Sequence, residues 1–452
     1  MKNNFNNIYF IGIGGISMSG LAELMLDEGL FVAGSDKNDS HIVKKLAKMG
    51  AKIHLNHNSD HITDDIDLVV YTSAISNDNP ELLRALQLNL AIMDRAEFLG
   101  YVMKNYHNSI CVSGTHGKTT TTGMLSSILI ETDLEPTIFL GGEMDSIGGN
   151  IKHGSNNLLL TEACEYKRNF LKFNPTMELI LNIDVDHLDY YKDLQDIKNA
   201  FLEYANKLPK SGVLIANVEN ENLFKDLKCN VATFGKENNA DFYATNIKYL
   251  PTPSYMLMNK GNKLVEINLQ VFGEHNILNS IAASAACVML GISVESIKKG
   301  LENFKGTHRR YEFKGFYKNA VIIDDYAHHP TEMKTTLLTA KTYSQGRVIT
   351  IFQPHTYSRT IALLDEFAEA LKLSDETILL DIYAARETDT RAVHSKDLAN
   401  KIKEVGGNVI YAKSFEDATN ILNDMISNGD TVITMGAGNV NTIAEHLIVT
   451  EQ

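Results

Sequence analysis

A short glycine-rich turn constrains the fold of this chain more than any other segment. The turn, Gly114-Thr-His-Gly-Lys-Thr-Thr120, follows the apolar run 110–113 and opens a threonine-rich helix. In such a strand–turn–helix arrangement, backbone N–H groups point inward and cradle phosphates, while Lys118 can reach the terminal phosphates and the Thr119 hydroxyl can ligate Mg²⁺. The spacing between the two glycines is shorter than in the usual GxxxxGK motif, yet the pattern predicts an ATP site. The residues expected to bind ATP are Gly114, Thr115, His116, Gly117, Lys118, Thr119 and Thr120.

A second glycine turn lies near the N-terminus, where Gly12-Ile-Gly-Gly-Ile-Ser17 follows an apolar strand and opens a helix. Small residues at such a turn let the backbone approach a diphosphate at the helix N-terminus. Asp36 ends the next strand, about where an acidic residue would meet a ribose hydroxyl. Ser17 replaces the third glycine of GxGxxG, so this turn alone leaves open a nicotinamide, another nucleotide or a tight structural connection. Two such turns on one chain favour a ligase or kinase over an oxidoreductase, which needs only one.

Short apolar runs alternate with helical patterns along the whole chain, which predicts parallel sheets covered by helices. The alternation starts afresh at residue 109 and again near residue 313, so domain boundaries are expected near 107 and 312. Residues 238–273 carry the alternating pattern of antiparallel strands instead. In the last third we expect strands at 320–323, 348–352, 377–380, 408–411 and 431–435, and helices at 330–341, 361–371, 396–405 and 415–425.

The composition excludes several classes of protein. A length of 452 residues suggests about three domains, and 44% hydrophobic with 22% charged residues excludes a largely disordered chain. The net charge of −14 argues against binding nucleic acid or a membrane surface, because both partners are polyanions. The four cysteines form no CxxC pair, and we find no signal peptide and no apolar run of the roughly 18 residues that span a membrane. We therefore expect a cytoplasmic protein.

Seven motifs in order resemble those of the Mur ligases of peptidoglycan synthesis, over essentially the whole chain. They are Gly12–Ala22, Gly114–Thr122, Glu162–Glu165, Asn182–His187, His275–Asn279, Gly306–Tyr311 and Asp324–Glu332. The resemblance implies an α/β protein of three domains. These are a Rossmann-like UDP-sugar domain (1–107), a central P-loop ATPase with a mixed sheet (108–312) and a Rossmann-like amino-acid domain (313–452).

The resemblance also implies a reaction. ATP phosphorylates the carboxylate of UDP-N-acetylmuramate to an acyl phosphate, the amine of L-alanine attacks, and phosphate leaves. The expected partners are these substrates, and the expected state is a monomer or weak homodimer. The main alternative is a ligase that recycles murein by adding a tripeptide to the same sugar nucleotide. More remote alternatives are an NAD-dependent oxidoreductase and a nucleotide-binding switch without catalysis.

The same resemblance implies roles for individual residues of the ATP site. Thr119, Glu162 and His187 are expected to hold Mg²⁺, although a Glu at a strand end or a His among acids is commonly just solvated. Asn276 and Asn279 lie one helical turn apart and are expected at ATP, with helix capping as the alternative for Asn276. Arg310 is expected at phosphate and Asp325 at the ribose or at a hinge. Phe201 stands where sister ligases carry a carbamylated lysine, with Lys198 nearby, so no carbamate is expected.

Two further sets complete the expected site. Tyr326, His328 and Arg359 are expected at the amino acid, where His328 could orient the amine and Arg359 could bind the carboxylate; Thr356 stands where many relatives have a second arginine. His329 is expected only to begin a helix. The residues expected at the UDP-sugar are Gly12, Gly14, Gly15, Ile16, Ser17, Asp36 and Ser73. The expected catalytic residues are Lys118, Glu162, His187, Arg310, Asp325 and His328.

Overall fold

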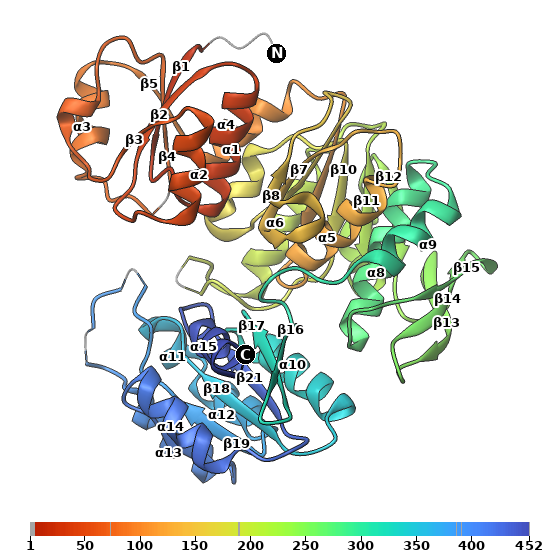
Figure 1. The fold of residues 1–452 in the computed structure, drawn as a ribbon. Coiled ribbons are helices and arrows are strands. Elements are labelled where there is room, and N and C mark those ends of the chain that lie inside the picture. Colours follow the sequence, from red (N-terminus) through yellow and green to blue (C-terminus); the bar gives the residue numbers. More distant parts are fainter. Residues whose placement is uncertain (1–4, 73, 189, 386, 390, 452) are drawn as a thin grey trace. The chain divides into compact units, whose positions relative to one another are not determined.

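The computed structural model describes residues 5–72, 74–188, 190–385, 387–389 and 391–451 (Figure 1). The chain forms two compact units. The first takes in the chain up to Asn246 together with Tyr255–Asn268 and Leu278–Phe304. The second contains Ile247–Ser254, Leu269–Ile277 and the chain from Lys305 onward. Together they carry three sheets that alternate with helices, so the predicted α/β class with three such parts is confirmed.

The N-terminal sheet is parallel, with the strand order β3-β2-β1-β4-β5 of a Rossmann-like fold. Capping residues mark where its helices begin and end. Ser40 caps one helix, which ends at Gly50 in the left-handed conformation, and Asp94 forms a capping box with Glu97. The strands are β1 (Asn7–Ile11), β2 (Phe31–Ser35), β3 (Lys52–His54), β4 (Leu68–Tyr71) and β5 (Ala91–Asp94). The helices are α1 (Ile16–Asp27), α2 (His41–Met49), α3 (Pro80–Gln87) and α4 (Arg95–Met103).

The central sheet has ten strands in the order β15-β14-β13-β12-β11-β10-β6-β9-β7-β8. Strands around β6 and β10 pair in parallel, whereas β7 and β8 are antiparallel, so the sheet is mixed as predicted. Its first strands are β6 (Asn108–Ser113), β7 (Thr137–Met144), β8 (Gly149–Lys152), β9 (Leu158–Glu162) and β10 (Met177–Ile180). The others are β11 (Val213–Asn217), β12 (Asn230–Phe234), β13 (Phe242–Lys248), β14 (Ser254–Asn259) and β15 (Asn262–Asn268). Helices α5 (Lys118–Leu129), α6 (Leu194–Ala205), α7 (Glu221–Phe224), α8 (Glu274–Met289) and α9 (Val294–Asn303) accompany these strands.

The C-terminal sheet has the order β16-β17-β21-β18-β19-β20, with β16 antiparallel to β17 and the other pairs parallel. Its strands are β16 (Glu312–Tyr317), β17 (Ala320–Asp325), β18 (Val348–Phe352), β19 (Glu376–Leu379), β20 (Val409–Tyr411) and β21 (Thr431–Met435). Its helices are α10 (Pro330–Tyr343), α11 (Tyr357–Ala362), α12 (Leu364–Leu371), α13 (Ser395–Glu404), α14 (Phe415–Met425) and α15 (Asn441–Glu451). The single helix predicted over 361–371 was wrong, because Leu363 leaves the helical conformation (φ −125°) between α11 and α12.

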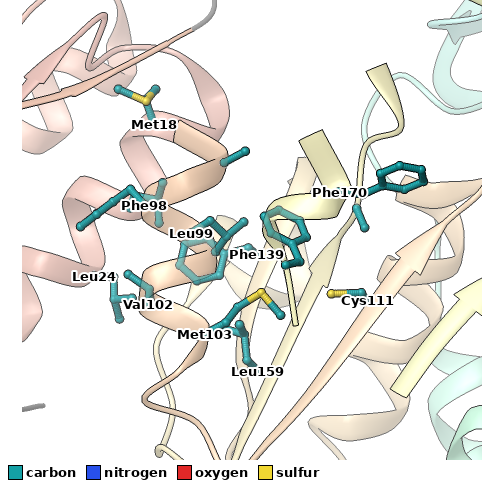
Figure 2. Close-up of a cluster of buried hydrophobic side chains, with 14 of the residues drawn as sticks. Met18, Leu24, Phe98, Leu99, Val102, Met103, Cys111, Phe139, Leu159 and Phe170 are labelled. Carbon is teal, nitrogen blue, oxygen red and sulfur yellow. The ribbon is translucent and has the colours of Figure 1, made fainter. Parts of the chain in front are cut away.

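One hydrophobic core joins the first two sheets (Figure 2). Phe98 and Val102 of α4 and Leu24 of α1 belong to the same buried cluster as Phe139 of β7 and Leu159 of β9. Burying side chains from both sheets in one cluster is favourable, because apolar area removed from water contributes about 25 cal/mol per Å². The N-terminal and central sheets therefore form one unit. Among the described residues no helix is long and apolar enough to span a membrane.

Candidate functional site

The predicted ATP loop joins β6 to α5, and its shape depends on two glycines in the left-handed region. Gly114 has φ 131° and Gly117, which caps α5, has φ 84°. The loop after β10 fixes the turn through Asn182. The N–H of Thr115 donates to the Asn182 carbonyl (3.1 Å), and the N–H of His116 donates to the Asn182 side chain (2.8 Å). The turn thus presents the N-terminus of α5, which attracts anions.

Space at this turn is tight. A Cβ at position 117 would lie 2.7 Å from Oδ1 of Asn279, a residue of α8. The structure therefore places one of the two predicted asparagines directly beside the loop. Asn276 has a different surrounding, since its amide donates to the carbonyl of Phe272 (2.7 Å).

Lys118 is held within the loop by four oxygen atoms. Its Nζ lies 2.5 Å from the Gly114 carbonyl and 3.1 Å from that of Thr115. The two carboxylate oxygens of Glu165 lie 3.1 and 3.0 Å from the same Nζ, and Glu165 is only 3% exposed. Burial disfavours the charged lysine, but Glu165, Cys164 and Glu162 together outweigh it, so the pKa of Lys118 is raised. The reasoning from sequence missed Glu165, although it ends the Glu162–Glu165 motif.

Two of the three predicted metal ligands lie together. The Thr119 hydroxyl donates to Oε2 of Glu162 (3.1 Å), and the Glu162 carboxylate also accepts from the N–H of Gly141 (2.7 Å). Hydroxyl and carboxylate oxygens are ligands that Mg²⁺ prefers. This pair at the end of β9 and the start of α5 fits a magnesium ion bound beside the phosphates of a nucleotide.

His187, the third predicted metal ligand, lies on the Glu165 side of the loop. Its Nε2 is 3.8 Å from Oε1 of Glu165 and 3.7 Å from Oδ2 of Asp186, and the ring packs on Tyr166 with centroids 4.6 Å apart. Within the described part of the chain, no three His, Cys, Asp or Glu side chains are arranged to hold a metal ion. Phe201, at the position of the carbamylated lysine, is fully buried against Phe170.

The N-terminal glycine turn is closed by Asp36. Gly12 has φ 80°, and the N–H of Gly14 donates to Oδ2 of Asp36 (2.9 Å). The other carboxylate oxygen accepts from the N–H of Asn38 (3.0 Å). Asp36, predicted at a ribose, thus positions the turn. Gly15 precedes α1 without a side-chain cap, which leaves that helix N-terminus available to an anion.

A small cavity lies between the start of α1 and the end of β9. Its lining includes Ser17 of α1, Arg95 of α4, Asn150 of β8 and Glu162 of β9. Asn150 also donates to the carbonyl of Ile16. Ser17, predicted at the sugar nucleotide, and Glu162, predicted at the metal, therefore line one cavity. Ser73, predicted at the same substrate, lies outside the described residues.

In the second unit, two arginines flank one tyrosine ring. The guanidinium carbons of Arg309 and Arg310 lie 4.9 and 5.1 Å from the ring centroid of Tyr326. Arg309 also donates to Asp324 (3.2 Å) and to the carbonyl of Gly436 (2.7 Å), whereas Arg310 does not share those two acceptors. Contacts of this kind between a cation and an aromatic face are attractive.

Asp325 supports the turn between β17 and α10. Its carboxylate accepts from the N–H of Ala327 (2.8 Å) and from the hydroxyl of Thr336 (2.8 Å). Burial raises the pKa of Asp325 to about 6. These contacts hold the start of α10 against the end of β17, and the ribose and hinge roles both stay predictions. His329 caps α10, accepting from the N–H of Thr331 (3.3 Å).

Two of the three predicted amino-acid residues, His328 and Arg359, contact His355, which the sequence reasoning did not assign, and Tyr326 contacts His328. The ring of His328 lies 5.3 Å from Tyr326 and 5.7 Å from His355, and Nη1 of Arg359 is 3.3 Å from Nδ1 of His355. His355 in turn stacks on Tyr383 at 5.8 Å. His355 stands in the run 353–359 that contains Arg359, so that run was the signal for it.

Comparisons with known proteins show what the chain is similar to. Three family models match successive segments: "Mur ligase family, catalytic domain" at residues 7–107, "Mur ligase middle domain" at 112–287 and "Mur ligase, glutamate ligase domain" at 309–438. A UDP-N-acetylmuramate–L-alanine ligase of Acetivibrio thermocellus is 48% identical over 100% of this chain and 97% of its own length. One of Clostridium kluyveri is 49% identical over 97% of both chains.

Solved structures have the same fold. The UDP-N-acetylmuramate–alanine ligase MurC of Thermotoga maritima is 30% identical, with a TM-score of 0.84 over 99% of each chain. A murein peptide ligase of Psychrobacter arcticus shares the fold at 24% identity, with a TM-score of 0.75 over 98% of each chain. Because relatives that are 48–49% identical match it over nearly its full length, the chain belongs to the Mur ligase family.

Proposed function

We propose that this protein joins L-alanine to the carboxylate of UDP-N-acetylmuramate at the expense of ATP, through an acyl phosphate. The observation that carries the proposal is the full-length similarity, at 48–49% identity, to proteins named for this reaction. The murein peptide ligase is the second candidate, but its likeness at 24% identity concerns the fold alone. An oxidoreductase leaves the Lys118 turn and the three ligase family models without an explanation.

The ATP loop supports the nucleotide half of the reaction. The N-terminus of α5 and the ammonium of Lys118 bind and orient the phosphates, since both carry positive charge into a partly buried turn. Thr119 and Glu162 would hold Mg²⁺, which neutralises charge on the phosphates when it is bound. His187 completes the set expected from the family and lies beside Glu165.

The cavity between Ser17 and Glu162 supports the sugar-nucleotide half. A diphosphate at the N-terminus of α1 would leave the muramyl carboxylate free to extend along the cavity toward Glu162. Positioning the two reacting groups in one enclosed space raises the rate, because their encounter no longer costs translational freedom. Residues 1–107 are thus proposed as the UDP-sugar domain and residues 108–312 as the ATPase domain.

The cluster in the second unit supports the amino-acid half, which we assign to residues 313–452. Arg359 can pair with a carboxylate through its planar guanidinium. His328 can orient the amine or accept its proton. Its Nδ1 lies 2.9 Å from the Tyr326 carbonyl, which fixes the imidazole, and 3.5 Å from Glu332. We propose that Arg310 acts at the ATP phosphates and that Asp325 acts at the hinge.

Phosphate release is the direct test. The protein is incubated with ATP, Mg²⁺ and UDP-N-acetylmuramate, and L-alanine, glycine, L-serine or the L-Ala-D-Glu-diamino acid tripeptide is added separately. Release with L-alanine, together with a product of the corresponding mass, is the expected result. Release only with the tripeptide would assign the recycling activity instead, and no release with any acceptor would contradict a ligase.

A further inference from the structure

Glu165 is a buried acid that the proposed reaction does not use. It lies in the loop after β9, is 3% exposed, and places both carboxylate oxygens within 3.1 Å of Lys118 Nζ. Its backbone is fixed as well, since its carbonyl accepts from the hydroxyl of Tyr191 (2.5 Å) and from the N–H of Arg168 (2.8 Å). These two bonds fix the main chain at the position from which the carboxylate reaches Lys118.

This contact uses up the hydrogen-bonding capacity of the lysine. An ammonium group has three N–H donors, and Nζ already faces four oxygens, two from loop carbonyls and two from Glu165. A phosphate oxygen that approaches Lys118 must therefore take over a donor from one of them. The carbonyls belong to the turn itself, which leaves Glu165 as the acceptor that competes with phosphate.

The charges around the loop also disfavour a phosphate that arrives without a cation. Lys118 contributes one positive charge, while Glu165 and Glu162 contribute two negative ones, and both carboxylates act on the lysine. Asp184 adds a further carboxylate, 3.4 Å from Nε2 of His116. A nucleotide that arrives without a cation would bring three or four more negative charges into a partly buried site, where repulsion is strong.

We propose that Glu165 is a positioning residue that cancels the charge of Lys118, so that the loop accepts a nucleotide well only together with a divalent cation. The inference rests on the proposed function, because it assumes that the Lys118 loop binds ATP. It goes further in naming the side chain that makes binding depend on the cation. Since Glu165 also lies 3.8 Å from His187, the same carboxylate links the lysine to the predicted metal histidine.

Calorimetric binding of ATP and ADP to the full chain, in EDTA and in Mg²⁺, tests this inference. In the wild type we expect a large ratio between the affinities with and without Mg²⁺. Glu165→Gln keeps the size of the side chain and removes the charge, so metal-free binding should tighten by about tenfold or more and the ratio should fall. Glu219→Gln, a change at an exposed acid of the same sheet region, is the matched control and should leave the ratio unchanged.

Two further variants separate charge from packing. Glu165→Asp keeps the charge and should retain most of the cation dependence, whereas Glu165→Ala should behave like Glu165→Gln. In a Lys118→Met background, Glu165→Gln should change metal-free binding far less, because its effect passes through the lysine. Thermal unfolding of each variant reports whether it is folded.

The outcomes are distinct. The inference would be overturned if folded Glu165→Gln kept the wild-type ratio of affinities with and without Mg²⁺. It would also be overturned if Glu165→Asp and Glu165→Gln lowered that ratio equally. Either result would leave the ligase assignment intact. If the wild type bound no nucleotide even with Mg²⁺, both the inference and the proposed function would be overturned. If Glu165→Gln does not fold, the same comparison with Glu165→Ala decides the question.

Discussion

The hydroxyl of Thr119 donates a hydrogen bond of 3.1 Å to the carboxylate of Glu162, joining the first turn of α5 to the end of β9. The two residues are 43 positions apart in the chain. The contact puts two oxygen ligands suited to Mg²⁺ beside the N-terminus of a helix that attracts phosphate. This pair is the most direct structural support for the proposed nucleotide site.

Removing either partner should lower activity strongly. Thr119→Val or Glu162→Gln is expected to reduce L-alanine-dependent phosphate release by about 100-fold, since each removes a ligand that stabilises charge during phosphoryl transfer. Thr121→Val is the control on the same helix, because the Thr121 hydroxyl is buried and has no hydrogen-bond partner within the part of the chain that the structure describes. Equal losses in all three variants would indicate that helix packing, and not the ligand pair, matters.

Gly117→Ala should impair nucleotide binding through a clash as well as through backbone strain. Gly117 and Gly261 both have φ 84°, but a Cβ at 117 would lie 2.7 Å from Asn279, whereas nothing lies within 4 Å at 261. Strain alone costs about 1 kcal/mol, so Gly261→Ala should lose roughly that much stability. Gly117→Ala should lose more and bind ATP at least about tenfold more weakly. Thermal unfolding and calorimetric titration measure the two effects, and identical behaviour of the variants would contradict the role of Asn279.

The ring of Tyr326 should matter more than its hydroxyl. Arg309 and Arg310 lie 4.9 and 5.1 Å from its centroid, and such contacts depend on the aromatic face. Tyr326→Phe is therefore expected to keep the KM for L-alanine within a small factor, whereas Tyr326→Leu should raise it by about tenfold. Steady-state kinetics with varied L-alanine check this, and a large effect of Tyr326→Phe would assign the role to the hydroxyl.

The free energy of unfolding should decrease as the pH is lowered, because of His275. Burial lowers the pKa of His275 to about 4, and its Nδ1 has no hydrogen-bond partner among the described atoms. The unfolded chain, with a pKa near 6.5, binds this proton first as the pH falls, so folding loses stability between about pH 6.5 and 4. The loss should reach about 2 kcal/mol at pH 5.

Chemical unfolding at pH 7 and pH 5 measures this loss. His275→Gln should flatten the dependence relative to the wild type, whereas His107→Gln, at an exposed position, should not. A wild-type profile that His275→Gln leaves unaltered would assign the pH dependence to other groups.

Local sequence was sufficient for the turns and for most helices that begin at a marked residue. The predicted turn between strand and helix is present, with Gly114 and Gly117 at positive φ. Ser40 caps the start of α2, and Gly50 in the left-handed conformation ends it. These features depend on the conformational freedom of glycine and on side chains that bond their own backbone, so they can be read from a few neighbouring residues.

The break at Leu363 and the short elements β3, α3 and β5 were not predicted. Their apolar patterns are too short to distinguish, and contacts with other elements decide their conformation. The contacts that charged side chains make were not predicted from the sequence either. Glu165 was quoted in a motif without a role, and Asp36 was assigned to a ribose, because a sequence does not tell which way a carboxylate turns.

By itself, the sequence determined the α/β class, the two glycine turns and, through seven motifs, the family. These depend on residue types and short spacings along the chain. Only the tertiary structure decided that Thr119 pairs with Glu162, that Lys118 is held by Glu165, and that His355 joins His328 to Arg359. Such pairs are set by the register of parallel strands and by burial, which bring together side chains from distant segments at one sheet edge.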